Sequence, residues 1–106
     1  MSDSAFESLA DSLLAALEEG IGGHVGANEV DAELQGGILT VDGDEGTWVV
    51  NKHAPTRQIW VSSPKSGARH YAFEATSGQW RDTRGGGELL ATLSAELGVT
   101  LAWRPQ

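Results

Sequence analysis

Residues 38–51 read ILTVDGDEGTWVVN, two apolar runs on either side of a cluster of turn-forming residues. The runs at 38–42 and 47–51 are rich in β-branched and aromatic residues, which is typical of strands. Between them, an Asp-Gly pair and a Glu-Gly pair are turn signals. A connection this short joins antiparallel neighbours, so the stretch predicts a β-hairpin around which the rest of the fold is arranged.

Four further runs extend this hairpin in both directions. Before it, apolar and acidic residues alternate over 28–34, which is the period-two pattern of a half-buried strand. After it, strands are expected at 58–62, 70–74 and 79–83, with turn-forming residues between them. Because the connections are short, the six strands are expected to form an antiparallel meander.

Helical periodicity appears on both sides of the strands. Apolar residues recur at helical spacing over 4–19, and Ser4 followed by Glu7 fits a capping box. A second leucine-rich period predicts a helix over 87–97, and the apolar tail 99–103 is expected to dock on the body. Two helices on one face of an antiparallel sheet of about six strands form an α+β, two-layer sandwich.

Alternation in the fourth predicted strand indicates which sheet face meets water. Ile59 and Val61 point to one side, which we expect the helices to cover, so Trp60 lies on the open side with polar neighbours. Trp48 and Trp80 are expected to fill the core. An aromatic side chain on a polar sheet face is a common partner anchor. The alternatives are a tryptophan covered by a neighbouring long side chain, or a register shifted by one residue.

Length and composition limit the classes of function. The chain has 106 residues, 40% of them hydrophobic, which predicts one domain over 1–106 without room for a deep enclosed active site. There is no cysteine, which excludes disulfides, thiol catalysis and a cysteine-held metal cluster within the chain. No apolar run approaches the length of a membrane span, and the first ten residues lack the pattern of a signal peptide. We therefore expect no membrane association.

Charge is segregated along the chain, whose net charge is −8. Residues 1–51 contain 11 acids and no base, whereas residues 52–106 contain four acids and seven bases. Such a division favours a cationic ligand or partner at the acidic half and disfavours binding of a nucleic-acid backbone there. The alternative is that the surplus acid only keeps the protein in solution.

Carboxylates concentrate on one flank of the predicted fold. In the first helix they fall within one arc beside the apolar face: Asp3, Glu7, Asp11 and Glu18. In the first strand they share the wet side: Glu29, Asp31 and Glu33. Exposed oxygen-rich sites suit hard cations at modest affinity, and His24 in the adjoining Gly-rich loop could join such a site. The alternative is a solvated acidic face, although like charges on one sheet face repel and need compensation.

Other catalytic motifs are not supported. Ser62 and Ser63 lack a nucleophile elbow, and the three glycines at 85–87 lack the surroundings of a phosphate loop. His53 and His70 flank the open sheet face and are interpreted as contact residues. Hydrolase, kinase and dinucleotide-enzyme functions are therefore disfavoured.

Several segments, in the right order and over nearly the whole chain, resemble the frataxin family. They are GILTV at 37–41, GTWVVNK at 46–52, QIWVSSP at 58–64, SG at 66–67, HY at 70–71 and WRDTR at 80–84. The last segment and the following helix are similar to the bacterial branch, CyaY, whereas the loop at 62–64 is similar to mitochondrial members. The acidic first helix and first strand fit the same resemblance.

The resemblance implies a frataxin-like fold and a role in iron–sulfur cluster assembly. Such a protein binds iron (Fe²⁺ or Fe³⁺) weakly on its acidic flank and docks on the cysteine desulfurase and the Fe–S scaffold protein, modulating sulfur transfer or iron delivery. Alternatives are ferroxidase or iron-storage activity on the same flank, or an acidic protein inhibitor without a metal role. The resemblance also implies a monomer, or oligomers that form in the presence of iron. The implied location is the bacterial cytoplasm, or the mitochondrial matrix if a presequence has been omitted.

Residue by residue, the resemblance extends the candidate sites. With the acids above, the candidate metal ligands are Glu7, Asp11, Glu18, Glu19, Glu29, Asp31, Glu33 and His24. The candidate partner-binding residues are Asn51, His53, Gln58, Trp60, His70 and Arg81. Alanines at 15 and 16 and a Gly-rich segment at 20–23 replace residues that are often acidic or polar in relatives, so a thinner acidic flank with low iron stoichiometry is expected.

Overall fold

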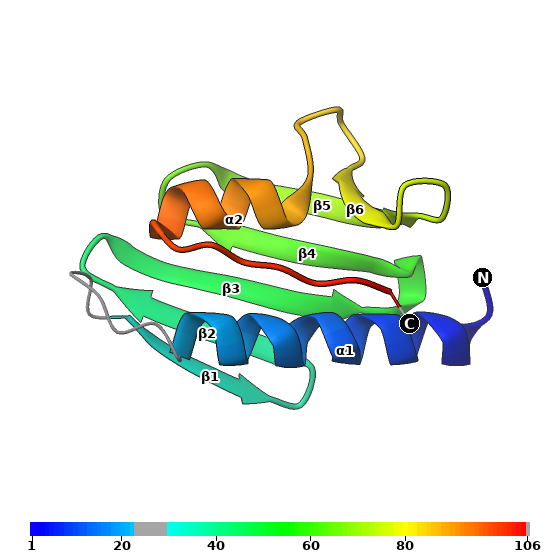
Figure 1. Cartoon of the computed structure of the whole chain (residues 1–106), viewed down its shortest axis with the longest axis horizontal. Helices are drawn as coiled ribbons and strands as arrows, with labels where there is room; N and C mark the ends of the chain where they lie inside the picture. The colour runs from blue at the N-terminus through cyan, green and yellow to red at the C-terminus, as the bar shows by residue number, and fades with distance from the viewer. Residues whose placement is uncertain (23–29, 106) are drawn as a thin grey trace.

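Six strands form one antiparallel sheet in the computed structural model, which describes residues 1–22 and 30–105. Each strand pairs with the next one along the chain, in the order β1-β2-β3-β4-β5-β6 (Figure 1). The strands are β1 (Asp31–Gln35), β2 (Ile38–Gly43), β3 (Gly46–His53), β4 (Gln58–Ser63), β5 (Gly67–Glu74) and β6 (Gln79–Asp82). A 3-10 turn, η1 (Ala54–Thr56), joins β3 to β4. The predicted meander is confirmed.

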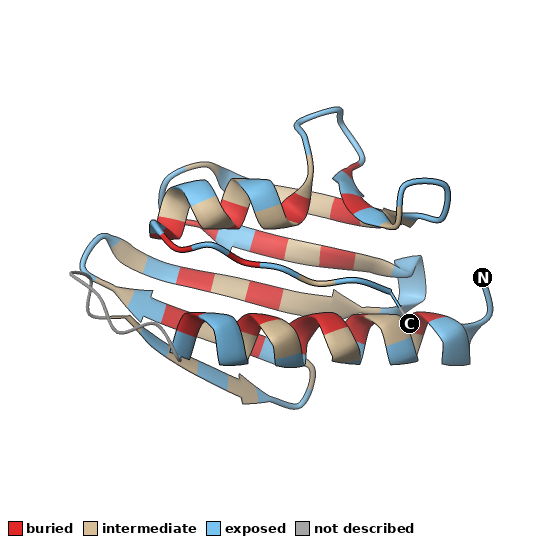
Figure 2. Ribbon diagram, viewed as in Figure 1, coloured by how far each residue is buried: buried red, intermediate tan, exposed pale blue. Residues whose placement is uncertain are grey.

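Both helices cover the same face of this sheet. Helix α1 (Asp3–Gly22) lies over its β1 side and α2 (Leu89–Leu97) over its β6 side, and the C-terminal tail runs between them (Figure 1). Figure 2 shows the buried residues on the helix faces and strands that meet in this layer. Trp48 and Trp80, 2% and 0% exposed, lie in this core as predicted. The α+β two-layer sandwich is therefore confirmed.

The first helix differs from the prediction at both ends. Its cap is Ser2, whose Oγ accepts from the backbone N–H of Ala5 at 3.1 Å, so the predicted capping box is wrong. The helix also continues through Gly20, which had been expected to end it. A Cβ at Gly20 would lie 3.1 Å from Leu101 Cδ2, so glycine lets the C-terminal tail approach the helix closely.

Most other bounds shift by one to three residues. The strand predicted over 28–34 begins at Asp31, and its first two positions lie outside the described residues. Strand β5 begins at Gly67 rather than 70 and β6 ends at Asp82 rather than 83. Helix α2 begins at Leu89 rather than 87 because the Glu88 carboxylate caps it, accepting from two backbone N–H groups at 2.7 and 3.2 Å.

The C-terminal tail closes the gap between the two helices. Val99 and Leu101 are buried, and the Trp103 indole donates from Nε1 to Ser12 Oγ on α1 at 3.0 Å. The Trp103 ring also contacts Trp80 of the core, with centroids 6.2 Å apart. The tail is thus part of the helical layer, and it joins α1 to the sheet.

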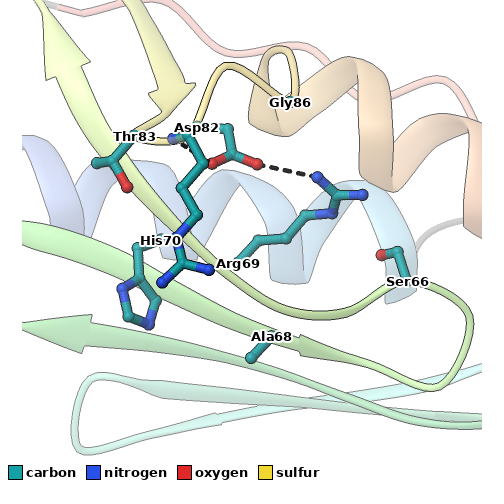
Figure 3. A pocket seen from close by; sticks show the side chains of 8 residues that line it. Ser66, Ala68, Arg69, His70, Asp82, Thr83 and Gly86 are labelled. Atoms are coloured by element: carbon teal, nitrogen blue, oxygen red, sulfur yellow. Dashed lines mark hydrogen bonds and ion pairs between the residues drawn. The ribbon is translucent and has the colours of Figure 1, made fainter.

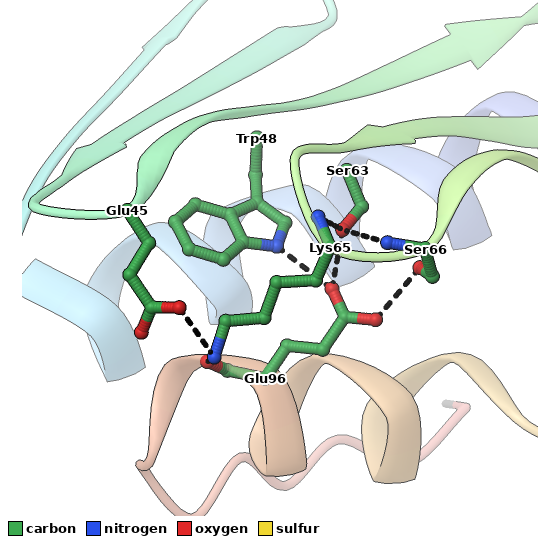
Figure 4. Close-up of polar contacts among 6 residues, drawn as sticks. All are labelled: Glu45, Trp48, Ser63, Lys65, Ser66 and Glu96. Atoms are coloured by element: carbon green, nitrogen blue, oxygen red, sulfur yellow. Dashed lines mark hydrogen bonds and ion pairs between the residues drawn. The ribbon is translucent and has the colours of Figure 1, made fainter.

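A single carboxylate ties α2 to the sheet. Glu96 accepts hydrogen bonds from Trp48 Nε1 at 2.9 Å, Ser63 Oγ at 2.5 Å and Ser66 Oγ at 2.7 Å (Figure 4). Lys65 adds a bond from Nζ to the Glu96 backbone oxygen at 3.1 Å. Although partial burial raises the pKa of Glu96, the three donated bonds outweigh it and lower that pKa below its ordinary value. The carboxylate is therefore held ionised.

Candidate functional site

The acids on the first half of α1 are paired with bases from the sheet side of the molecule. Lys52 reaches from β3 to α1, where its Nζ contacts the carboxylates of Glu7 and, at 2.8 Å, Asp11. Bonds to Asp11 and Glu7 raise the pKa of Lys52. Asp3 pairs in the same way with Arg57, at 2.8 Å. A cation binding at Glu7 or Asp11 would therefore have to compete with the Lys52 ammonium group.

Glu18 has a role that its spacing did not indicate. Its Oε2 accepts the backbone N–H of Leu34 at 2.9 Å, so it occupies a donor on the edge strand β1. An unpaired edge strand can pair with another chain, and this carboxylate helps to protect it. The neighbouring Glu19 is exposed.

Three carboxylates lie on the open face of β1 and β2, and we call them the acidic edge: Asp31, Glu33 and Asp42. Asp31 is the register partner of Asp42, so two like charges face each other across the strands. Asp42 Oδ1 accepts from Thr47 Oγ1 at 2.8 Å, which compensates only part of this repulsion. The alternation predicted for the first strand is thus present in the described part of it.

The acidic edge is open rather than a preformed cage. Among residues 1–22 and 30–105, no three His, Asp or Glu side chains are grouped closely enough to hold a metal ion. The candidate ligands Glu29 and His24 lie outside the described residues. Exposed carboxylates that do not point to a common centre are expected to bind a hard cation weakly and to exchange it readily.

A row of side chains crosses the open face, and we call it the aromatic row: Ile38, Asn51, Trp60 and His70. They are register partners on the consecutive strands β2 to β5. Ile38 is 42% exposed, an unusual position for a large aliphatic side chain. Ile38 was not among the predicted contact residues, although its spacing of two from Thr40 and of four from Asp42 places all three on the open face.

Trp60 is half-buried and not the freely exposed side chain that was expected. Its ring lies between the imidazoles of His53, at a centroid distance of 3.6 Å, and His70, at 4.3 Å, each tilted by only 9°. Its Nε1 donates to Gln58 Oε1 at 2.9 Å, and His53 Nδ1 is 2.8 Å from Thr56 Oγ1. The alternative of a covered tryptophan is therefore partly realised, by two histidines, and the stack holds the indole in one orientation.

All six predicted partner-binding residues lie on this one face. His53 is the register partner of Gln58, and the same row continues through Ala72 to Arg81 on β6. Arg81 is exposed and lies 3.7 Å from Glu74, measured from Nε to Oε2. The open face thus changes from acidic at β1 and β2 to aromatic at its centre, and towards β6 it carries the Arg81–Glu74 pair.

The fold and this open face define a small α/β sandwich that presents contrasting surfaces on one sheet. Residues 1–102 match the family model described as the frataxin-like domain. A curated relative, the mitochondrial frataxin homologue of Schizosaccharomyces pombe, is 39% identical over 97 residues, which are 91% of this chain and 58% of the relative. The chain thus spans little more than half of that relative's length. It belongs to the frataxin family.

Solved structures agree with this assignment. Frataxin from Psychromonas ingrahamii, described within the CyaY protein family, superposes with a TM-score of 0.78 and 31% identity, covering 95% of this chain and 96% of that one. Frataxin from Saccharomyces cerevisiae, described as trimeric and complexed with ferrous iron, superposes with a TM-score of 0.69 and 34% identity, covering 89% and 82%. In the described part of our chain, no helix is long and apolar enough to cross a bilayer.

Proposed function

We propose that this protein is an iron-binding accessory factor of iron–sulfur cluster assembly that docks on the cysteine desulfurase and the scaffold protein and modulates sulfur transfer or iron delivery. The observation that carries the proposal is the junction of two surfaces on one sheet face. Glu33 of the acidic edge is the register partner of Thr40, two residues along β2 from Ile38 of the aromatic row. A cation held at the acidic edge would thus lie beside the surface that meets the partner.

The acidic edge supports weak iron binding. Its carboxylates are oxygen donors of the kind that hard cations prefer, and Asp31 and Glu33 are exposed. The repulsion between Asp31 and Asp42 is relieved when a cation binds between them. The ferrous complex described for the yeast relative supports the choice of iron.

The aromatic row supports docking. The two histidines fix Trp60 before any partner arrives, so little side-chain freedom is lost on binding. Asn51 beside it offers an amide for hydrogen bonds, and Ile38 adds apolar area. The negative charge of the acidic edge would attract a basic partner surface and raise the encounter rate more than the final affinity. The mitochondrial relative supports the mitochondrion as the site of action.

Docking is tested with Trp60→Ala in a reconstituted assembly reaction that contains the desulfurase and the scaffold. A central aromatic anchor contributes about 2 kcal/mol or more, so the variant should need roughly 30-fold more protein for the same effect on the assembly rate. Trp60→Phe keeps a ring between the histidines and should retain most of the effect. If Trp60→Ala matches the wild type while circular dichroism shows an intact fold, docking through this face is wrong.

Iron binding is tested with the double variant Asp31→Asn, Glu33→Gln. Anaerobic Fe²⁺ should broaden amide signals along β1 and β2 in the wild type by paramagnetic relaxation, and much less in the variant. Glu74→Gln serves as the control, because it changes a carboxylate on β5, far from β1 and β2 in the strand order. Equal broadening in the double variant and the wild type would exclude the acidic edge as the iron site. Oxygen consumption after air is admitted to these samples separates binding from ferroxidase activity.

A further inference from the structure

A hollow of about 450 Å³ lies where β5 and β6 meet the loop that leads to α2. Its lining includes two guanidinium groups, an imidazole and a hydroxyl, from Arg69, Arg84, His70 and Thr83. Figure 3 shows Arg69, His70 and Thr83 among the lining side chains, with a dashed line between Asp82 and Arg69. Ligand pockets commonly have volumes of about 300–1,000 Å³, so the hollow has room for a small molecule.

Asp82, the single carboxylate in this lining, is already committed to protein donors. Its Oδ2 accepts from Arg69 Nη1 at 2.9 Å, and its Oδ1 accepts from the backbone N–H of Arg84 at 2.8 Å. Its side chain is only 5% exposed. The bond from Arg84 and the ion pair with Arg69 lower the pKa of Asp82 despite its burial. Asp82 therefore orients Arg69 and has few lone pairs left for a ligand.

The backbone at Gly86 lies directly against this ion pair. A Cβ at that position would lie 2.3 Å from both Arg69 Nη1 and Asp82 Oδ2. The Arg69 side chain makes one hydrogen bond within the described ranges, from Nη1 to Asp82. Its Nε is buried and is one of two buried side-chain polar atoms without a partner in the part of the chain that the structure describes. An arginine fixed by one nitrogen, with others unpaired, can still receive an acceptor.

Two further donors of the hollow also lack a protein acceptor among the described residues, whereas the Ser66 hydroxyl donates to Glu96. Within the described residues, the Arg84 side chain makes no hydrogen bond or ion pair, and the His70 ring makes only its stacking contact with Trp60. Two guanidinium groups against one carboxylate give the lining a positive charge, although the chain as a whole carries −8. Glu96 also acts on Arg69 through space, but its oxygens accept bonds from other residues.

We propose that this hollow, the Arg69–Arg84 pocket, binds an oxyanion group of a small molecule, either a phosphate or a carboxylate. The planar guanidinium fork suits both groups, because each offers two oxygens to paired N–H donors. His70 and Thr83 supply further donors to the same group. The hollow has more room than one oxyanion requires, so it can also accommodate a larger ligand that carries such a group.

Occupation of the pocket would reach the docking face through one side chain. His70 lines the pocket and also stacks on Trp60. An anion held by the His70 ring would restrain the imidazole that stacks on the Trp60 indole at a centroid distance of 4.3 Å. The pocket is thus placed to couple a small anionic ligand to the surface that we propose for partner docking.

The test is titration of the ¹⁵N-labelled, iron-free protein with inorganic phosphate and, separately, with citrate, each against sodium chloride at equal ionic strength. We expect saturable amide shifts centred on residues 66–70 and 82–86. Loss of a charge-assisted hydrogen bond in Arg84→Gln should weaken binding roughly tenfold or more. Gly86→Ala displaces the Arg69–Asp82 pair without any change of charge and should weaken binding similarly.

The control is Arg104→Gln, which removes one positive charge at an exposed residue outside the pocket and should leave the affinity unchanged. Tighter binding of phosphate would assign a phosphorylated ligand, and tighter binding of citrate a polycarboxylate. The proposal is overturned if neither anion gives saturable shifts, if chloride reproduces them, or if Arg84→Gln and Arg104→Gln weaken binding equally.

Discussion

Replacement of Glu96 by alanine tests the polar tie between α2 and the sheet. The carboxylate accepts three side-chain bonds, and a hydrogen bond to a charged group contributes about 1.5–3 kcal/mol. Trp48 is 2% exposed, so its indole N–H would be left buried without an acceptor, at a cost of about 1–3 kcal/mol. Ser63 and Ser66 share the same carboxylate, and contributions within one network do not add. We expect Glu96→Ala to lose about 3–4 kcal/mol of unfolding free energy.

That loss is large for a chain of 106 residues, whose unfolding free energy should be roughly 5–15 kcal/mol. It should lower Tm by roughly 15 °C. Urea unfolding followed by tryptophan fluorescence measures the difference, and Glu19→Ala, at an exposed carboxylate on α1, controls for the loss of one negative charge. A loss below about 1 kcal/mol, the contribution of one ordinary hydrogen bond, would refute the view that Glu96 is a shared acceptor.

The same carboxylate gives the prediction a pH dependence. Because the folded pKa of Glu96 is lowered, its contribution is fully present above the ordinary pKa of 4.5 and is lost as pH falls through the lower folded value. Wild-type stability should therefore decline in acid below about pH 4.5, and Glu96→Ala should decline less steeply there. Parallel acid limbs for the two proteins would show that Glu96 titrates normally.

Two further predictions concern the proposed surfaces. Lys52→Met removes the base that contacts both Glu7 and Asp11. Paramagnetic broadening by Fe²⁺ should then spread from β1 and β2 to the first half of α1. Broadening that stays confined to β1 and β2 would show that Lys52 does not mask these acids. Ile38→Ser should weaken docking roughly tenfold in the assembly assay, because apolar contact with the partner is lost. The free energy of unfolding in urea should change by less than about 0.5 kcal/mol. If the variant docks as well as the wild type, Ile38 is not part of the interface.

Periodic features of the sequence predicted the fold well. The two-residue alternation assigned the covered and open faces, and it placed Trp48 and Trp80 in the core and Trp60 on the open side. The turn residues predicted the meander, since short connections leave strands few arrangements. These features depend on neighbours in the chain, which is why one sequence could reveal them.

Contacts between distant segments were not predictable in the same way. The pairing of Lys52 with Glu7 spans 45 positions, and no local pattern indicates which acid a given base will meet. Helix α1 continues through Gly20 despite the low helix propensity of glycine, and this glycine lies against Leu101 of the tail, a contact that no local pattern indicates. The ring stack on Trp60 depends on strand register, which the sequence alone left open.

The meander and the tail differ in how they constrain folding of the chain. Strands that pair only with sequence neighbours close short loops at a small entropic cost, so the sheet can form early and quickly. The bond from Trp103 to Ser12 joins residues 91 positions apart, and a contact that closes so long a loop is expected to form late. Interactions made after the transition state chiefly slow unfolding. Contacts of the tail should therefore slow unfolding, and so lengthen the lifetime of the native state, more than they change the folding rate.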